Sequence, residues 1–395
     1  MKIKLGVIFG GDSVEHEVSI ITAVQAMEFI DEDKYEIVPI YITKEKEWYT
    51  GHALRDIENY KDLDNLKRYT KNVVLYNKNN EFVLQSKKGL KRTINTIDIA
   101  FPIVHGANIE DGTLVGYLSL IGLPFVGSDI YAAVVGQDKV FMKQIFQANN
   151  IPISPYVWFF ESEYKENQKA VLDKIKKLKF PVVVKPSRLG SSVGISKVKT
   201  IKDIELAIEE AIQYDQKVVI EEAVENLIEV NCSVLGNYEY QLRSEVEQVE
   251  TTNDILTYED KYLSKGKGKM KTGIKKGGNV PNHLIPANIS KKLKDEVITL
   301  AKDSFKALNS SGVVRIDFLI DKKANKVYVN EMNTIPGSLA FYLWEPAGKS
   351  YTELLDDVIT LAIKDYKKRS KFKTSFSTNI LSNYNGVKGL KGIKK

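Results

Sequence analysis

The sequence predicts an α/β protein whose first part is built on an open parallel sheet. Apolar runs of strand length alternate with segments whose apolar residues recur at helical spacing, which is the pattern of α/β organisation. A glycine turn follows the first apolar run directly, and loops at the carboxyl ends of parallel strands commonly carry function. At 395 residues the chain is long enough for two or three domains.

The first segment, residues 1–127, contains the strands of the predicted parallel sheet. Apolar runs bounded by polar or turn residues predict strands at residues 4–10, 35–43 and 97–106. A helix is predicted after Glu17, because apolar residues recur there at helical spacing. We therefore expect an N-terminal α/β domain in this segment.

Two further segments and a tail follow. The central one, residues 128–224, contains a predicted helix near 138–150 and paired strands at 180–186 and 217–224, with a glycine and serine turn between them. The third segment comprises residues 225–375. It is predicted to hold a strand (230–236), a long lysine-rich loop (258–285), a helix (294–308), a hairpin (313–333) and a final helix (352–366). Residues 376–395 predict an irregular basic tail.

Composition narrows the class of protein. The net charge of +6 is concentrated in two lysine clusters that lack interleaved aromatics, so solubility and attraction of small anions explain it better than nucleic acid does. No apolar run approaches the roughly 20 residues that cross a bilayer, and no signal-peptide cleavage site follows the start, so we expect a cytoplasmic protein without membrane contact. The single cysteine, Cys232, is expected to be a packed core thiol.

A hairpin near the C-terminal end carries candidate metal ligands. Two strand-like runs, joined by a polar turn of hairpin length, contain Asp317, Glu331 and Asn333. Two carboxylates and an amide oxygen are the ligands that Mg²⁺ takes from a protein beside phosphate oxygens. An ordinary hairpin with acidic residues facing water has the same pattern, so the hairpin alone leaves both interpretations open.

The central segment carries candidate phosphate ligands. Lys185 has apolar residues on both sides, so its ammonium requires an anionic partner or must reach solvent. Gly190 and Gly194 follow it and allow a backbone to approach phosphate closely. Lys139 is a second candidate cation, although a lysine taken alone is more often a solvated surface charge.

Six motifs in sequence order make the chain resemble the D-alanine:D-alanine ligase family of the ATP-grasp superfamily. The resemblance extends from Gly6 to about Ala362 and implies an ATP-grasp fold behind a Rossmann-like N-terminal domain that binds substrate. The matching residues are GGDSVEHEVS (10–19), HGANIEDGTLVG (105–116), GQDKVFMK (136–143), VVKPSRLGSSVG (183–194), Lys261-Tyr262, and RIDF (315–318) through NEMNTIPG (330–337).

The resemblance implies that ATP phosphorylates the carboxylate of one D-amino acid, and that the amine of a second then attacks the acyl phosphate. ATP would lie between the central and third segments, with two Mg²⁺ or Mn²⁺ ions on Asp317, Glu331 and Asn333. Glu229, rather than Glu225, is expected at the ribose. The other nucleotide contacts implied are Lys139, Lys185, Ser192, Glu221, Glu222, Val224 and Lys261.

Catalytic roles also follow from the resemblance. Glu15 would pair with the ammonium of the first amino acid, although the helix dipole favours an acidic residue there in any case. Ser191 and Tyr262 would complete a hydrogen-bonded triad with Glu15. Arg315, on the same strand face as Asp317, would stabilise the oxyanion together with the backbone N–H of Gly337.

The lysine-rich loop that contains Lys261 and Tyr262 has two interpretations. It would close over substrate and exclude water, which protects an acyl phosphate from hydrolysis. An ordinary surface loop is the alternative for its run of lysines.

The site of the second substrate is the least specified. The resemblance places His105 near that substrate, but a lone histidine after a strand is more often structural, and His16, His52 and His283 have no metal-ligand spacing. Where relatives have a serine that holds the second carboxylate, this chain reads SLAFYLWEP, so Ser338, Tyr342 or Lys261 are the candidates.

The expected product is D-alanyl-D-alanine for peptidoglycan precursors, and the resemblance implies that the enzyme is a homodimer. A ligase that uses D-serine, D-lactate or another second substrate is an alternative. A non-catalytic ATP-binding regulator is another, and an interaction protein built on the basic loop and tail is a weaker one. Because all six proposed metal, phosphate and oxyanion side chains are present, catalysis is favoured.

Overall fold

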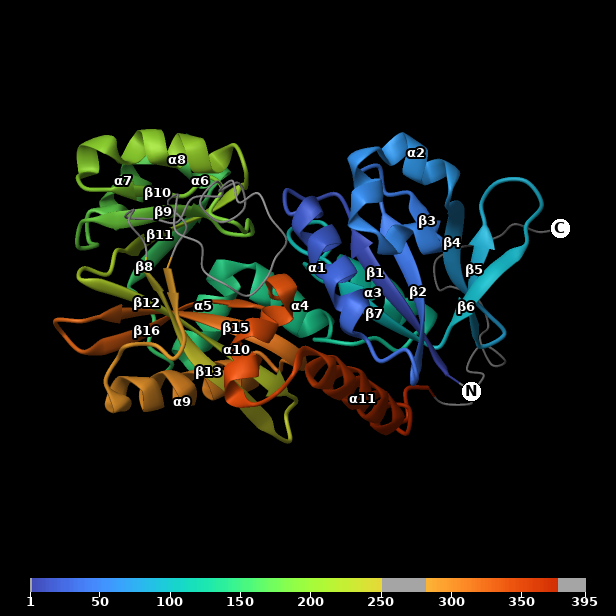
Figure 1. The fold of residues 1–395 in the computed structure, drawn as a ribbon. Helices are drawn as coiled ribbons and strands as arrows, with labels where there is room; N and C mark the ends of the chain where they lie inside the picture. The colour runs from blue at the N-terminus through green and yellow to red at the C-terminus, as the bar shows by residue number, and fades with distance from the viewer. Residues whose placement is uncertain (1, 251–281, 376–395) are drawn as a thin grey trace, which may run out of the picture.

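The computed structural model describes residues 2–250 and 282–375, and three sheets organise them. Figure 1 shows the N-terminal sheet in one lobe and the other two sheets together in a second lobe. In the part of the chain that the structure describes, no helix combines the length and apolar character needed to cross a membrane.

The N-terminal sheet is mixed rather than wholly parallel. Its strands lie in the order β6-β5-β4-β3-β2-β1-β7, and only β1, β2 and β7 are parallel. The expectation of a parallel sheet was therefore too simple, because four antiparallel strands extend it. Asn79 and Asn80, both with positive φ, form the turn between two of them. The strands are β1 (Ile3–Gly10), β2 (Tyr35–Ile42), β3 (Trp48–Thr50), β4 (Lys71–Lys78), β5 (Glu81–Ser86), β6 (Thr93–Ile97) and β7 (Ile99–Ile103).

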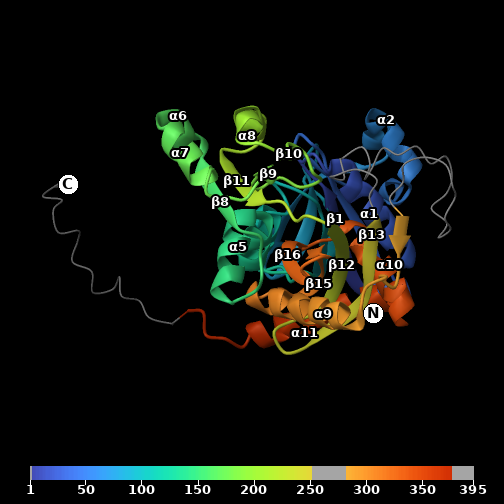
Figure 2. The ribbon, with the colours of Figure 1, turned by 90° about the vertical axis from the view of Figure 1, so that its left-hand side faces the viewer.

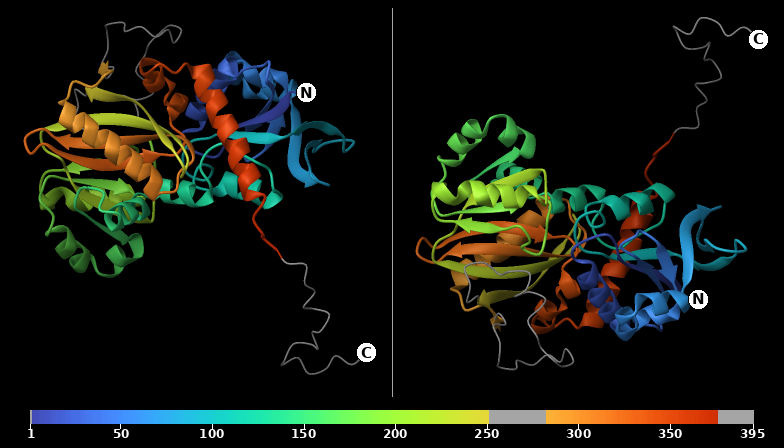
Figure 3. Two further views of the ribbon diagram at one scale, coloured as in Figure 1. Left: turned by 90° about the horizontal axis from the view of Figure 1, so that it is seen from below. Right: turned by 90° about the horizontal axis from the view of Figure 1, so that it is seen from above.

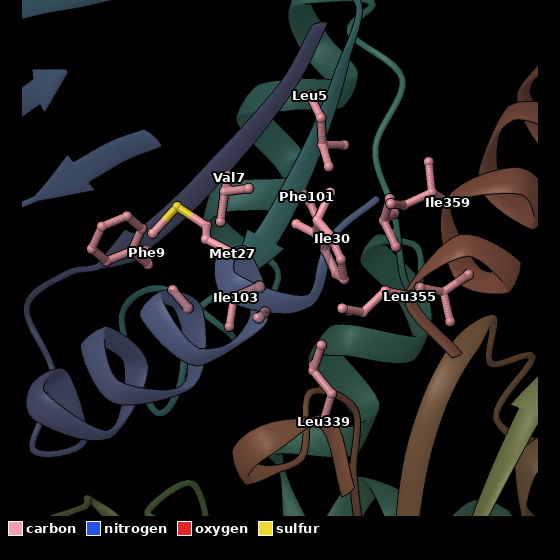
Figure 4. Close-up of a cluster of buried hydrophobic side chains, with 14 of the residues drawn as sticks. Leu5, Val7, Phe9, Met27, Ile30, Phe101, Ile103, Leu339, Leu355 and Ile359 are labelled. Atoms are coloured by element: carbon pink, nitrogen blue, oxygen red, sulfur yellow. The ribbon is translucent and has the colours of Figure 1, made fainter. Parts of the chain in front are cut away.

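Helices cover both faces of this sheet. Leu5, Val7 and Phe9 of β1 pack on one face with α1 (His16–Phe29) and the last helix, α11 (Tyr351–Arg369), as Figure 4 shows. The other face packs against α3 (Thr113–Ile121). Short helices α2 (Leu63–Arg68), η1 (His52–Arg55) and η2 (Ile57–Lys61) complete the segment. The last helix of the chain thus shares a core with its first strand.

The central sheet is antiparallel, with the order β10-β9-β11-β8. Its strands are β8 (Tyr156–Phe160), β9 (Val182–Pro186), β10 (Ser196–Val198) and β11 (Lys217–Glu222), and the predicted pairing of the second with the fourth is confirmed. The helices are α6 (Glu161–Glu166), α7 (Gln168–Ile175), η3 (Ile201–Asp203) and α8 (Ile204–Ile212). They cover the outer face of the sheet. Upstream, α4 (Ile130–Gln137) and α5 (Lys139–Ala148) meet at Asp138.

The third sheet is antiparallel in the order β14-β13-β12-β15-β16. One face packs on α5 and on α9 (Lys291–Ala307), which runs beneath the strands in Figure 2 and across them in Figure 3. The strands are β12 (Leu227–Gly236), β13 (Gln241–Glu250), β14 (Asn282–Leu284), β15 (Gly312–Asp321) and β16 (Lys326–Asn333). The short helices η5 (Gly337–Ala340), α10 (Phe341–Trp344) and η6 (Glu345–Ala347) precede α11.

Candidate functional site

The face of the third sheet that turns away from α9 carries a row of polar side chains. Asp317 of β15 lies in register with Glu331 of β16 on one side and with Asn231 of β12 on the other. Asn231 lies in turn opposite Glu247 of β13. Their sequence neighbours pack on the α9 face, so strand alternation directs the row to the opposite face.

The candidate metal ligands lie together at one end of this row. The Asp317 carboxylate accepts hydrogen bonds from Arg315 Nε at 2.7 Å and Nη2 at 2.8 Å, and from Asn333 Nδ2 at 3.2 Å. In the described part of the chain no three His, Cys, Asp or Glu side chains are grouped for a metal. The predicted ligand set has two carboxylates and takes its third oxygen from Asn333. Two carboxylates and one amide oxygen are hard donors that suit Mg²⁺ or Mn²⁺.

A β-bulge gives β16 two consecutive side chains on this side. Asp317 pairs with Glu331 but Phe318 pairs with Val329, so Asn330 is the extra residue. As a result Asn330 contacts Lys185 and Glu331 contacts Lys139, at 3.2 Å and 3.4 Å. The bulge thus connects the hairpin to both candidate phosphate cations.

Lys185 has the anionic partner that its apolar flanks require. Its ammonium forms an ion pair with the buried Glu221 of β11, and Lys143 Nζ of α5 lies 2.6 Å from the same carboxylate. Burial alone would raise the pKa of Glu221, but the two ammonium groups hold this pKa at about 2. Burial likewise opposes the charged form of Lys185, yet Glu221 and Glu331 keep its pKa above the ordinary value. Lys143 and Lys185 thus share the Glu221 carboxylate beside the pocket.

One pocket between the central and third sheets collects most of the predicted nucleotide residues. Glu229 lines it, whereas Glu225 is exposed and pairs with Lys179, 3.4 Å away. Lys261 lies outside the described residues. The pocket lining includes Lys139, Lys185, Ser191, Ser192, Glu221, Glu222, Val224, Glu229, Asp317 and Glu331.

The glycine and serine turn brings Ser191 to Glu15. Ser191 and Ser192 both have left-handed backbones, with φ of 56° and 60°, a conformation that costs free energy and is concentrated at functional sites. The Ser191 hydroxyl donates a hydrogen bond to the Glu15 carboxylate. A Cβ added to Gly190 would lie 2.7 Å from Glu15 Oε2, so a larger side chain there would displace the Glu15 carboxylate. Glu15 also directly precedes α1, which agrees with the alternative prediction that it lies at the start of a helix. Tyr262, the third member of the predicted triad, lies outside the described residues.

The candidate residues for the second substrate lie beside Arg315 and Thr22. His105 is buried, its Nε2 lies 3.3 Å from Thr22 Oγ1, and burial lowers its pKa to about 4. Ser338 donates its backbone N–H to the same Thr22 oxygen at 3.1 Å. Burial raises the pKa of Tyr342, which also lies in the field of Glu247 and Arg315. A Cβ on Gly337 would meet no atom within 4 Å, so sterics alone do not require this glycine.

Sequence reasoning missed Glu110, which lies inside a quoted motif. Its carboxyl accepts hydrogen bonds from Thr334 Oγ1 at 3.0 Å, Ile335 N at 3.2 Å and Gly106 N at 2.9 Å. Burial, reinforced by the nearby charge of Glu15, raises the pKa of Glu110 to about 8. The two adjacent acidic residues in HGANIEDG were the only sequence feature that could have pointed to Glu110 as a site residue. Lys143, in GQDKVFMK, was missed in the same way.

Comparison with known proteins gives consistent matches. The family model described as D-ala D-ala ligase N-terminus matches residues 4–128, and the one described as D-ala D-ala ligase C-terminus matches residues 145–360. The D-alanine–D-alanine ligase of Thermosipho melanesiensis is 40% identical over 380 residues, covering 96% of this chain and 98% of the relative. That of Clostridium acetobutylicum is 38% identical over 369 residues, covering 92% and 98%.

Solved structures agree with these matches. The D-alanine–D-alanine ligase from Coxiella burnetii superposes with a TM-score of 0.78 at 27% identity, covering 94% of this chain and 96% of that one. The VanG D-Ala:D-Ser ligase from Enterococcus faecalis superposes with a TM-score of 0.76 at 29% identity, covering 92% and 100%.

Proposed function

The chain belongs to the D-alanine–D-alanine ligase family of ATP-grasp enzymes, and we propose that it joins two D-alanine molecules through an acyl phosphate in the pocket between its central and third sheets. It is an ATP-dependent carbon–nitrogen ligase of peptidoglycan synthesis. One observation carries the proposal for the site. A single pocket is lined by the carboxylates of the hairpin, by both candidate phosphate lysines and by the serine that contacts Glu15.

Each reacting charge has a partner in this arrangement. Lys139 and Lys185 bind the phosphates of ATP, and the backbone of the glycine and serine turn covers them. Glu221, Glu222, Val224 and Glu229 hold the adenosine end, with Ser192 and Lys261 as further contacts. Asp317, Glu331 and Asn333 would hold Mg²⁺ or Mn²⁺, which neutralises phosphate charge when bound.

The amino-acid end of the site lies where Glu15 meets the turn. Glu15 accepts the ammonium of the first D-alanine, and Ser191 fixes the direction of its carboxylate. Arg315 and the N–H of Gly337 stabilise the oxyanion that forms when the second amine attacks. Tyr262 would complete the closure around this point.

The second D-alanine is placed beside Arg315. We propose that Tyr342 binds its carboxylate through the phenol, with Ser338, Lys261 and a neutral His105 around it. Because VanG, one of the structural neighbours, is a D-Ala:D-Ser ligase, D-serine is the second candidate for this position. We also propose that the protein works in the cytoplasm as a homodimer, which light scattering after gel filtration tests.

The decisive experiment is phosphate release from ATP with Mg²⁺, with products identified by mass. D-alanine alone should give D-alanyl-D-alanine, and pairing it with D-serine or D-lactate should give less mixed product. ATP binding without release on any amino acid would favour the regulator instead. Glu331→Gln should abolish turnover by weakening metal binding, whereas Asp295→Asn, an exposed acidic residue on α9, should leave turnover unchanged.

A further inference from the structure

The row of polar side chains continues past the proposed metal ligands to a buried carboxylate. Glu247 of β13 has no exposed surface, and its carboxylate accepts a hydrogen bond from Asn231 Nδ2 at 3.0 Å. On its other side, His283 Nδ1 of β14 lies 2.6 Å from the same carboxylate. Burying a carboxylate costs free energy unless it is paired, and here Asn231 and His283 are its partners. Such an arrangement at a sheet face beside the proposed site suggests a functional role.

The array lies on the same face of the sheet as Arg315, whose guanidinium binds Asp317, the residue opposite Asn231. Burial opposes the charge on Arg315, and the carboxylates of Asp317 and Glu247 both favour it. The titratable groups that interact electrostatically with Arg315 are Asp317 on its own strand, Glu247 on β13, Tyr342 on α10 and the half-exposed His283 on β14. Asn231, between the two carboxylates in register, has a buried Oδ1 without a hydrogen-bond partner in the described structure.

Asp317 has two tasks that conflict. In this structure both of its oxygens are engaged by Arg315. As a proposed metal ligand, Asp317 would also share its charge with the ion, which weakens its hold on the guanidinium. A second fixed carboxylate would keep Arg315 oriented during that change.

We propose that Glu247 is a positioning residue, which holds Arg315 and Tyr342 in place for the carboxylate of the second D-amino acid. His283 and Asn231 fix the direction of its carboxylate. The inference rests on the proposed role of Arg315. It concerns a residue that does not touch substrate, because Glu247 is fully buried.

A purely structural task for Glu247 would be to attach β14 to β13. The backbone already provides that attachment, since β14 pairs with β13 at Val249 and His283. The positioning role therefore predicts changes in D-alanine kinetics that go beyond a change in stability.

The test compares Glu247→Gln with Glu245→Gln. Glu245 lies on the same strand but pairs with Lys294 of α9, at 2.5 Å, so it is a matched control. We expect Glu247→Gln to lower kcat/KM for D-alanine at least about tenfold, or roughly 1.4 kcal/mol, while KM for ATP stays unchanged. Equal kinetics in the two variants, or equal losses for ATP and D-alanine, would overturn the inference.

A second variant keeps the test decisive if Glu247→Gln does not fold. The hydrogen bond to Glu247 raises the pKa of His283, so the wild-type pH profile of kcat/KM should contain a step above the ordinary histidine range. His283→Gln, at a half-exposed side chain, should remove that step. A wild-type profile in His283→Gln would refute the inference.

Arg315→Lys, measured in the same assay, separates this inference from the proposed function. If Arg315→Lys loses activity and the Glu247 and His283 variants do not, only the positioning role fails. If Arg315→Lys is also fully active, the proposed role of Arg315 itself fails.

Discussion

Among single residues, Glu110 connects the N-terminal domain to the segment between Asn333 and Gly337. Its carboxyl accepts hydrogen bonds from Thr334 and Ile335, which directly follow the last proposed metal ligand. It lies close to the charge of Glu15, and this proximity together with burial favours the protonated form. The proton on Glu110 therefore allows two carboxyls to lie near each other.

This proton predicts a pH dependence of stability. The pKa of Glu110 rises from an ordinary 4.5 to about 8 on folding, so the folded state binds more protons between these values. The stabilisation is fully present below the lower value and is lost as pH rises through the upper one. In Glu110→Gln the free energy of unfolding should vary less across this pH range, as urea titrations would measure. Glu58→Gln, on the exposed η2 helix, should show the same change of unfolding free energy with pH as the wild type. The prediction is wrong if Glu110→Gln also shows the wild-type pH dependence.

A second prediction at this scale concerns Gly190. Alanine there would place its Cβ 2.7 Å from Glu15 Oε2 and displace the carboxylate from Ser191. Because displacement of a positioning group by about 1 Å can cost a hundredfold in rate, we expect Gly190→Ala to lower kcat/KM for D-alanine at least about tenfold. Gly116→Ala in α3, where an added Cβ meets nothing, is the control for steady-state kinetics. Unchanged kinetics in Gly190→Ala would show that the contact between Glu15 and Ser191 has no catalytic part.

At the scale of elements, Asp138 fixes the start of α5 to the central sheet. Its carboxylate caps the helix at Val140 N and Phe141 N, and it also accepts a hydrogen bond from Ser187. The buried Lys217 Nζ lies 2.9 Å from it. These contacts hold the base of the glycine and serine turn.

Loss of this carboxylate should destabilise the chain strongly. Asp138→Asn leaves the buried Lys217 ammonium without its counter-charge, and removal of one partner of a buried pair costs about 3–5 kcal/mol. Urea unfolding measures this cost. Asp173→Asn breaks an exposed pair with Lys176 and should change stability by less than about 1 kcal/mol. If Asp138→Asn and Asp173→Asn both changed stability by less than about 1 kcal/mol, Asp138 would not be the counter-charge on which Lys217 depends.

The sequence predicted the main elements well where pattern determines structure. Periodicity located α1, α9 and α11, and the hairpin of β15 and β16 forms with Asp317 opposite Glu331. Spacing placed Arg315 and Asp317 on one face, and the structure joins their side chains directly.

Features that depend on distant contacts were not predictable. The bulge at Asn330 has no sequence signature, yet it decides which lysine each side chain meets. The strands β3 to β6 lack long apolar runs, so pattern did not reveal them. Glu110 is an ordinary acidic loop residue until folding partly buries it beside Thr334. The roles of the site residues remain predictions.

At the scale of the whole molecule, the first and last parts of the chain share one core. Leu355 and Ile359 of α11 pack with Leu5 of β1, and Leu339, two residues after the proposed oxyanion donor Gly337, packs there too. The predicted limits of the domains, residues 1–127, 128–224 and 225–375, separate the chain by sequence. The packing of α11 on β1 couples the third segment to the first.

Nucleotide binding should couple the central sheet to the third sheet, because the nucleotide would contact both. The pocket has the central sheet on one side and the hairpin of the third on the other, and it concentrates lysines that phosphate would neutralise. ADP with Mg²⁺ at about one hundred times its Kd should therefore raise the free energy of unfolding by about 2.7 kcal/mol. In Glu331→Gln the part of this gain that depends on Mg²⁺ should disappear, because one of the two carboxylate ligands is lost. Calorimetry of the ADP-bound protein with Mg²⁺ measures the whole stabilisation, and calorimetry with EDTA measures the part that does not depend on Mg²⁺. Asp295→Asn serves as the control. An equal Mg²⁺ effect in all three proteins would move the metal away from the hairpin.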